Sequence, residues 1–359
     1  MKRTTISDIA REAGVSKGAV SYALNGRPGV SEATRSRITA IAARMGWAPS
    51  SVARALSGGR AGAFGLVIDR PAEVLAAEPF FMRLIAGIQH ELGPGPTSLV
   101  LQVSPDHDTE LEIYHRWHAE RRVDGVLLID LRADDNRLDV LASIGLPAVV
   151  IGEPLGRTDI PSAWIDDRAA IDEVLDYLVA LGHRRVVRVA GPREFLHSRM
   201  RSAAFLAAAA RVGLEAADVV HTDYSGESGA AAARRALVSA LPPTAMVFDN
   251  DVMAVAALGV AQELGLSVPG QLSLIAWEDS LLCRLVRPAL SAVRRPVGEF
   301  GALAVSLLRQ VVTGASVSDA CTSAPILVTR ASSGPVCRDR PDVSPWASTA
   351  DWFVPPRFP

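Results

Sequence analysis

Residues 5–25 read TISDIAREAGVSKGAVSYALN, and they contain two short helical patterns that meet at Gly14. Glycine adopts the positive φ that a sharp turn between two helices requires. Ser16 is a typical N-cap, so we expect the second helix to begin directly after it. This stretch therefore predicts two short helices joined by a tight turn.

Each predicted helix has one apolar and one polar face. The apolar side chains recur at spacings that pack one helix across the other: Ile9, Ala10, Val15, Val20 and Leu24. The outer face of the second helix carries Lys17, Ser21 and Tyr22. A packed inner face and a polar outer face that fits the major groove of DNA are what a helix-turn-helix needs. The alternative is a helical hairpin that serves packing alone.

The charge of the chain is divided unevenly, although its sum is only −2. Residues 1–60 hold ten basic and three acidic side chains, a net charge of +7, and the remaining 299 residues carry −9. A third helix is predicted in this basic part, from an N-cap at Ser31 to Met45, and Gly46 ends it. A compact basic head on an acidic body suits a head that binds phosphates and a body that does not.

The 359 residues are too many for one small core and predict two or three domains. Residues 47–59 follow the head and suit a helix that Pro49 and Ser50 begin and that Gly58 and Gly59 end. A helix this short is marginal in water by itself, so it requires something to pack against.

From Gly62 onward, strand-like and helical patterns alternate, which predicts an α/β fold with doubly wound parallel sheets. The β-branched, strand-like runs are 64–68, 98–103, 123–130, 148–152, 186–190, 245–248 and 273–277. The main helical patterns are 80–92, 169–181, 201–212, 229–241, 251–264 and 300–311. This length favours two linked lobes, one of residues 61–160 plus 292–331 and one of 161–291. Residues 332–359, rich in Pro, Ser and Arg, are predicted to be a disordered tail without a coiled coil.

Several motifs together resemble the lactose/galactose-repressor (LacI/GalR) family of bacterial transcription regulators over roughly residues 4–332. The most specific matches are Asp8-Ile9-Ala10, Ala13-Gly14-Val15-Ser16, Val20-Ser21 and Leu24-Asn25-Gly26. The body adds Val123-Asp124-Gly125-Val126, Leu181-Gly182-His183-Arg184-Arg185, Asp249-Asn250-Asp251 with Met253-Ala254, and Gly265-Leu266-Ser267-Val268-Pro269. The resemblance implies a helix-turn-helix domain over 1–46, a hinge helix and linker over 47–60, and an effector-binding and dimerisation domain over 61–331. The last would have a periplasmic-binding-protein fold.

The resemblance implies that the second helix of the head lies in the major groove of operator DNA. The implied DNA-contacting positions in the head are Thr5, Ser7, Ser16, Lys17, Gly18, Ser21, Tyr22 and Asn25. Lys17 suits guanine or a phosphate, and Tyr22 suits a thymine methyl group or a phosphate. Gly18 stands where relatives often carry a longer side chain, which removes one base contact. For Thr5, Ser7 and Asn25, helix capping alone is the alternative.

Residues 52–57 resemble the family's hinge helix. Leu56 matches the apolar wedge that enters the minor groove and opens a base step, and Ala53 is small enough to lie against the groove floor. Two hinge helices from two subunits would cover each other's apolar faces, which explains how so short a helix can be stable. The implied partners are therefore double-stranded operator DNA with a near-palindromic sequence and a second copy of the chain.

The body resembles proteins that hold a small ligand between two lobes. The implied effector-binding residues are Phe81, Arg201, Tyr224, Asn250 and Glu278. Arg201 offers charge-assisted donors, and Tyr224 offers a platform for a sugar or base ring. The alternatives are a surface arginine, a core tyrosine and, for Phe81, buried packing. Glu278 replaces the family's usual aspartate, which changes the reach of the carboxylate. A saccharide or glycoside is the favoured effector, and a purine or nucleoside acting as co-repressor is the alternative.

No other chemistry is predicted from the sequence. His115 and His118 share a helix face without a third ligand, so no metal site is expected. The chain has no glycine-rich phosphate motif and no convincing catalytic constellation, so neither a cofactor nor an enzyme activity is expected. No signal peptide or membrane-length apolar run is visible, and three widely spaced cysteines fit reduced thiols, so we expect a cytoplasmic protein. A solute-binding protein that serves a transporter is the rival class, which the basic head disfavours.

Overall fold

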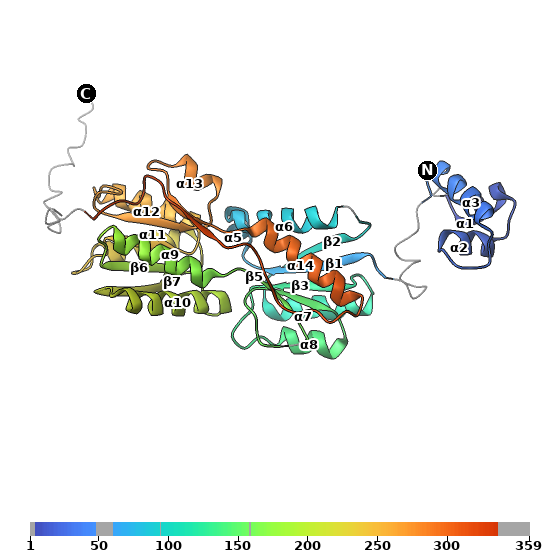
Figure 1. Ribbon diagram of the computed structural model, residues 1–359, viewed down its shortest axis with the longest axis horizontal. Coiled ribbons are helices and arrows are strands. Elements are labelled where there is room, and N and C mark those ends of the chain that lie inside the picture. Colours follow the sequence, from blue (N-terminus) through green and yellow to red (C-terminus); the bar gives the residue numbers. More distant parts are fainter. Residues whose placement is uncertain (1–3, 48–59, 94, 158, 337–359) are drawn as a thin grey trace, which may run out of the picture. The chain divides into compact units, whose positions relative to one another are not determined.

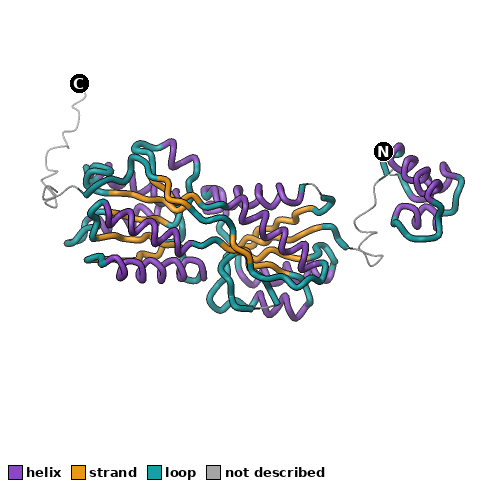
Figure 2. The backbone as a smooth tube through the Cα atoms, in the orientation of Figure 1, coloured by secondary structure: helices purple, strands orange, loops and turns teal. Residues whose placement is uncertain are grey.

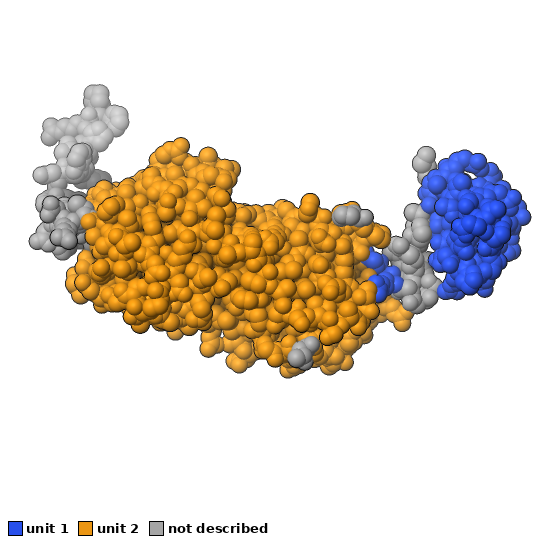
Figure 3. Space-filling model, in the orientation of Figure 1, with its two compact units in different colours: residues 1–62 blue, residues 63–359 orange. Residues whose placement is uncertain are grey.

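The computed structural model describes residues 4–47, 60–93, 95–157 and 159–336. The chain forms two compact units, residues 1–62 and residues 63–359 (Figure 3). The predicted hinge helix over 52–57, with Ala53 and Leu56, lies outside the described residues, as does the predicted tail from residue 337 onward.

The first unit contains the three helices that the sequence predicts, α1 (Ile6–Ala13), α2 (Lys17–Leu24) and α3 (Glu32–Arg44). Gly14 turns the chain between α1 and α2 with a φ of 63°, in the left-handed region. Ser16 caps α2 by accepting a hydrogen bond from the amide of Ala19 at 3.1 Å. The small core of the unit consists of Ile9, Ala10, Ala13, Val20, Ala23, Ile38, Ile41 and Ala42. Local capping and one apolar stripe per helix therefore determine this unit.

The second unit contains two sheets of six strands each, which we call the sheets of the first and second lobe (Figures 1 and 2). The first has the order β11-β5-β4-β3-β1-β2 and the second the order β12-β10-β9-β8-β6-β7. Every pair of neighbouring strands is parallel except β10 and β12. The predicted fold class, a helical head followed by two doubly wound α/β lobes, is confirmed.

Helices cover both faces of each sheet. The strands of the first lobe are β1 (Ala63–Asp69), β2 (Ser98–Ser104), β3 (Gly125–Ile129), β4 (Ala148–Ile151), β5 (Ser162–Trp164) and β11 (Ala320–Cys321). One of its faces packs against α6 (Pro79–Leu92) and α14 (Val297–Val312), and the other against α7 (His107–Ala119) and α8 (Arg137–Ile144). The short helix α5 (Ala72–Ala77) precedes α6.

The second lobe has the same layers. Its strands are β6 (Arg185–Ala190), β7 (Ala216–His221), β8 (Ala245–Phe248), β9 (Ser273–Trp277), β10 (Ser291–Arg294) and β12 (Ile326–Val328). One face packs against α9 (Asp167–Ala180) and α10 (Leu196–Val212), and the other against α11 (Gly226–Leu237) and α12 (Asp251–Glu263). The short helix α13 (Leu281–Leu285) follows β9. None of the helices in the described ranges is long and apolar enough to span a membrane.

The chain crosses between the lobes three times, which corrects the predicted lobe boundaries. It crosses after β5, after β10 and between β11 and β12. The predicted boundary at 160/161 is too early because β5 still belongs to the first sheet, and the boundary at 291/292 cuts through β10 of the second sheet. The third crossing was missed because β11 and β12 are too short to show a strand pattern.

The predicted tail begins too early. Ser332 is completely buried, and its hydroxyl donates to the carbonyl of Leu274 at 2.6 Å. The amide of Val336 donates to the carbonyl of Leu181 at 3.0 Å. The segment 332–336 is therefore part of the second lobe. It is held by individual hydrogen bonds of backbone and hydroxyl groups and not by a helix or strand, which is why its sequence has no hydrophobic periodicity.

Helices α6 and α14 approach each other through glycines. A Cβ atom at Gly87 would lie 2.0 Å from the carbonyl oxygen of Gly298, and one at Gly301 would lie 2.5 Å from the carbonyl oxygen of Leu84. Both clashes involve backbone atoms, which cannot move without separating the helices.

We predict that Gly87→Ala lowers the free energy of unfolding by about 3 kcal/mol, because it forces α6 and α14 apart. Gly259→Ala is the matched control: Gly259 also lies inside a helix, but no atom lies within 4 Å of its would-be Cβ. The control should gain up to about 1 kcal/mol from helix propensity. Denaturant unfolding of both variants measures this, and equal stability of the two would refute the close approach.

Candidate DNA-binding surface and ligand cleft

The residues predicted to contact DNA lie together on the solvent-exposed side of α1 and α2. Exposed positions are Thr5, Ser16, Lys17, Gly18, Tyr22 and Asn25, and Ser7 and Ser21 are partly exposed. The side chain of Tyr22 is 45% exposed, which is unusual for an aromatic residue in so small a unit. Their exposure leaves these side chains accessible to a partner, and their contact with DNA stays a prediction.

Several of these polar side chains also cap the helices. Thr5 and Asp8 form a capping box at the start of α1, and the Thr5 hydroxyl donates to the Asp8 carboxylate at 2.6 Å. The Asn25 amide donates to the carbonyl of Ser21 at 2.8 Å at the end of α2. Thr5 and Asn25 therefore do cap helices, as the alternative interpretation predicted. Both residues are also exposed, so their side chains remain accessible to a phosphate group.

Arg35 fixes α2 in place, a role that sequence reasoning missed. Its guanidinium donates from Nη1 to the carbonyl of Ala23 at 2.8 Å and from Nη2 to the carbonyl of Arg27 at 2.9 Å. These bonds tie the end of α2 and the following loop to α3. In the sequence, Arg35 is one basic residue among many, and nothing marks it as structural.

The two lobes of the second unit enclose a cleft with about 630 Å³ of empty space, part of it open to solvent. Most of its polar lining follows the carboxyl ends of β1, β3, β4, β7, β8 and β9, where ligands of open α/β sheets bind. The lining consists of Arg70, Glu78, Phe80, Phe81, Ile129, Asp130, Ile151, Gly152, Glu153, Ile165, Asp167, His197, Arg201, Tyr224, Asp249, Glu278, Arg295 and Phe300. The cleft thus combines an apolar wall with many charged groups.

Four of the five predicted effector-binding residues line this cleft: Phe81, Arg201, Tyr224 and Glu278. Asn250 is not among the lining residues, and its contact with an effector stays a prediction. Asn250 is 1% exposed; its Oδ1 accepts from the amide of Met253 at 2.9 Å, and its Nδ2 donates to the carbonyl of Tyr224 at 3.0 Å. It caps α12 and positions Tyr224, and the neighbouring Asp249 lines the cleft instead.

A chain of ion pairs runs through the cleft. The Asp167 carboxylate binds Arg201 Nε at 2.6 Å and Arg295 Nε at 2.9 Å. Arg295 also binds Glu278 at 2.6 Å, and Arg83 of α6 binds the other oxygen of Glu278 at 3.3 Å. Burial raises the pKa of Asp167, but the two guanidinium groups outweigh it, so its pKa lies below the usual value. The pair of Arg83 and Glu278 joins the first lobe to the second.

Tyr224 and its neighbours form the aromatic part of the cleft. The Tyr224 ring lies against Gly191, where a Cβ would come within 1.9 Å of the ring. Its hydroxyl hydrogen-bonds with His197 Nε2 at 2.7 Å, and the Arg70 guanidinium lies 5.0 Å from the ring centre. Burial, and then the positive field of Arg201, hold the pKa of His197 well below its usual value, so the imidazole is neutral. At 4% exposure, Tyr224 is both a core residue and part of the cleft wall.

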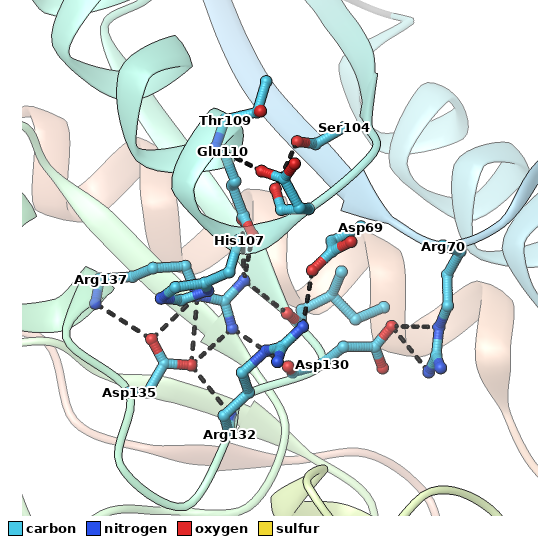
Figure 4. A network of polar contacts seen from close by, with 12 residues as sticks. Asp69, Arg70, Ser104, His107, Thr109, Glu110, Asp130, Arg132, Asp135 and Arg137 are labelled. Atoms are coloured by element: carbon cyan, nitrogen blue, oxygen red, sulfur yellow. Dashed lines mark hydrogen bonds and ion pairs between the residues drawn. The ribbon is translucent and has the colours of Figure 1, made fainter. Parts of the chain in front are cut away.

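A buried network behind the cleft holds the loop after β3 (Figure 4). Arg137 donates to the carbonyls of Ile129 and Asp130 at 3.2 and 3.1 Å, and it pairs with Glu110 and Asp135 at 2.8 and 2.6 Å. The side chain of Asp130, the first residue of this loop, pairs with Arg70. The amide of Leu196 then donates to the carbonyl of Leu131 at 2.7 Å, a backbone bond between the lobes.

Backbone strain is concentrated at the cleft. Among the described residues, four that are not glycine have a positive φ, and three of these line the cleft: Asp130 at 55°, Tyr224 at 72° and Glu278 at 89°. Such conformations persist where the surroundings enforce them, and they are typical of ligand sites. This supports the cleft as a functional site independently of its residue types.

Two carboxyl groups in the cleft are only weakly acidic. Burial raises the pKa of Glu78 to about 7, with Arg70 opposing and Asp130 adding to the rise. Burial also raises the pKa of Glu153 to about 7, with Asp167 adding to the rise and Arg201 opposing. The described residues contain no cluster of His, Cys, Asp and Glu that could hold a metal ion.

We predict that Glu78→Gln stabilises the protein at alkaline pH. The folded pKa of Glu78 lies above the unfolded value of 4.5, so its ionised form opposes folding and stability falls as the pH rises from about 4.5 to about 7. Glutamine stays neutral, so the variant should be more stable than the wild type by about 2 kcal/mol above about pH 8 and equal to it near pH 4.5. The free energy of unfolding of variant and wild type, measured across this pH range, tests the direction of the effect. Glu112→Gln, at an exposed position, is the control. A stability gain that does not depend on pH would contradict the raised pKa of Glu78.

Two family models match the chain. One, described as bacterial regulatory proteins of the lacI family, matches residues 5–50, and the other, a periplasmic binding protein-like domain, matches residues 175–333. The HTH-type transcriptional regulator CelR of Thermobifida fusca is 30% identical over 317 residues, which cover 87% of this chain and 93% of CelR. The HTH-type transcriptional regulator reg1 of Streptomyces lividans is 32% identical over 323 residues, with 87% and 91% covered.

Solved structures show the same architecture. The CelR–cellobiose complex matches with a TM-score of 0.70 and 29% identity over 92% of this chain and 100% of that chain. The lac repressor dimer bound to operator and the anti-inducer ONPF matches with a TM-score of 0.81 and 25% identity over 93% and 100%. The named relatives are transcriptional regulators and not enzymes. The chain therefore belongs to the lacI family of bacterial DNA-binding transcriptional regulators.

Proposed function

We propose that this regulator is a cytoplasmic homodimeric repressor that a sugar or glycoside in the cleft controls. The cleft carries the proposal: it combines aromatic walls with paired arginines and carboxylates at the ends of six strands from both lobes. Apolar ring faces of sugars pack on aromatic side chains, and charged groups bind hydroxyls through strong hydrogen bonds. The similar CelR structure contains cellobiose, which supports a saccharide. A nucleoside is the alternative that a ligand panel must include.

Exposed apolar side chains support the homodimer. In the first lobe these are Met82 of α6 and Leu101 and Val103 of β2, which are 66%, 44% and 46% exposed. In the second lobe, Leu281 and Leu285 of α13 are 58% and 64% exposed. Helices α6 and α13 and strand β2 lie along the upper edge of the second unit in Figure 1. A partner that spans both lobes at this edge would bury these side chains, and the similar lac repressor structure is a dimer.

The dimer in turn supports the proposed role of the hinge. Two copies bring two heads to the two half-sites of a near-palindromic operator. Each hinge over 52–57 would then meet its partner over the operator centre, with Leu56 as the wedge in the minor groove. A ligand that favours one arrangement of the lobes changes the spacing of the hinges, and this differential affinity is what links the cleft to DNA.

We predict that Leu56→Ala weakens operator binding at least about tenfold and leaves the melting temperature and ligand affinity unchanged, because only the wedge is lost. The assay is a mobility shift with duplexes selected from a random-sequence pool, with two chains expected per duplex. Leu241→Ala, at a leucine that is 75% exposed on the body, serves as the control. Operator binding as tight as that of the wild type would remove the wedge assignment.

We predict that Arg201→Ala abolishes the response to the effector and leaves operator binding intact. Its guanidinium is a cleft donor, and Asp167 keeps Arg295 as its partner in the variant. Arg211→Ala on the same helix is the matched control, since Arg211 is 49% exposed and pairs only with surface aspartates, Asp172 and Asp176. Calorimetry with the sugar that stabilises the wild type measures the effect; normal binding by the Arg201 variant would refute its role.

A further inference from the structure

The charged groups of the cleft are unequal in number. Its lining holds six carboxyl groups and three guanidinium groups. The carboxyl groups belong to Glu78, Asp130, Glu153, Asp167, Asp249 and Glu278, and the guanidinium groups to Arg70, Arg201 and Arg295. With Arg83 and Arg188 beside the lining, six carboxyl groups face five guanidinium groups, so no guanidinium group is in excess for an anionic ligand.

Each guanidinium group of the lining already has a carboxylate partner. Arg70 binds Asp130 at 2.9 Å, and Arg201 binds Asp167 at 2.6 Å. Arg295 binds both Asp167 and Glu278. An anionic ligand would have to displace one of these buried carboxylates or share a cation with it. Both cost free energy, because a buried carboxylate that loses its partner is left with an uncompensated charge.

The cations next to the lining also have carboxylate partners, although Nε and Nη1 of Arg188 have no hydrogen-bond partner among the described residues. Arg83 binds Glu278 at 3.3 Å, and the completely buried Arg188 binds Asp249. The hydrogen bond of Arg201 to Asp167 uses Nε, which leaves the two terminal Nη groups to donate to ligand oxygens. Such donors serve hydroxyl groups without requiring a charge on the ligand.

Glu78 and Glu153 are different, because neither carboxyl group forms an ion pair within 4 Å or a side-chain hydrogen bond with the residues that the structure describes. Both are partly exposed and line the cleft. The charged groups that act on Glu78 are Arg70, Asp130, Glu278 and Asp251, and those that act on Glu153 are Asp167, Arg201, Asp166 and Arg168. The two sets share no residue.

We propose that the effector is an uncharged or amine-bearing saccharide whose hydroxyl or amino groups donate to Glu78 and Glu153, and that the cleft rejects phosphorylated sugars and sugar acids. This inference rests on the proposed sugar-responsive function. It adds that the cleft selects ligands by their charge. The arginines, already paired with carboxylates, and the carboxyl groups of Glu78 and Glu153 would together disfavour an anionic ligand.

The test is a binding panel with the full chain at neutral pH, measured by thermal shift and calorimetry. Cellobiose, maltose and lactose are each compared with their 6-phosphorylated and uronic-acid derivatives, and glucosamine, glucose 6-phosphate, adenosine and guanosine complete the panel. Every sugar that binds should bind at least about tenfold more tightly than its anionic derivative. A phosphorylated sugar or sugar acid that binds as well as its neutral counterpart would overturn the charge selection and leave the sugar-responsive function standing.

The double variant Glu78→Gln, Glu153→Gln tests the two acceptors. Its affinity for the neutral sugar should fall at least about tenfold. The ratio of the affinity for the neutral sugar to the affinity for its phosphorylated derivative should also become smaller. Glu112→Gln, at an exposed carboxylate on α7, should change neither value. An unchanged gap in the double variant would overturn the roles of the two glutamates. Binding of nucleosides alone, or of no ligand in the panel, would overturn the sugar-responsive function and the charge selection with it.

Discussion

The buried carboxylate of Asp167 is the constraint on which the ligand cleft depends. It binds two guanidinium groups, from Arg201 of α10 and from Arg295 beyond the end of β10. Asp167 lies where the chain enters the second lobe, and Arg295 lies where it leaves. One ion-pair network thus fixes both the crossing segments and the groups that face a ligand. Because an isolated buried charge is costly, each member depends on the others.

Both apolar and polar contacts join the lobes: Val74 packs against the core of the second lobe, and Leu196 packs against that of the first. The ion pair of Arg83 with Glu278 and the backbone bond of Leu196 with Leu131 join the two sheets. A polar contact can exchange its partner for a ligand hydroxyl or a water molecule with little change in free energy, whereas a packed apolar contact cannot. The polar contacts at the cleft are therefore suited to two arrangements of similar stability, and the closed cores on either side stay rigid.

The sequence predicts the head and the β-α alternation well because both are encoded locally. Gly14, Ser16 and one apolar stripe per helix determine the head, and most of the longer strands stand out as β-branched runs, although β7 (Ala216–His221) was missed. Arg201, Tyr224 and Glu278 could be placed in the cleft only through the family resemblance. Asp167 and Arg295 could not be predicted, because they are 128 positions apart and each is marked only by its ion pair with the other.

The position of Asn250 outside the cleft lining has a local physical reason. Three polar residues, Asp249, Asn250 and Asp251, stand between β8 and α12, and any of them can cap a helix. Only the geometry of the strand end decides which one caps and which one faces the cleft. The short strands β5, β11 and β12 were missed for a related reason: two or three residues carry no periodicity.

The three crossings between the lobes also determine the order in which the protein can be completed on the ribosome. The head precedes the body in the chain, and its core draws only on residues that emerge early. The first lobe, by contrast, receives α14 and β11 only after the second lobe has been synthesised up to β10. Until then, the apolar face of α6, with Gly87 at its centre, has no helical partner and stays exposed to the solvent and to chaperones. The DNA-binding head is thus complete before the second unit is.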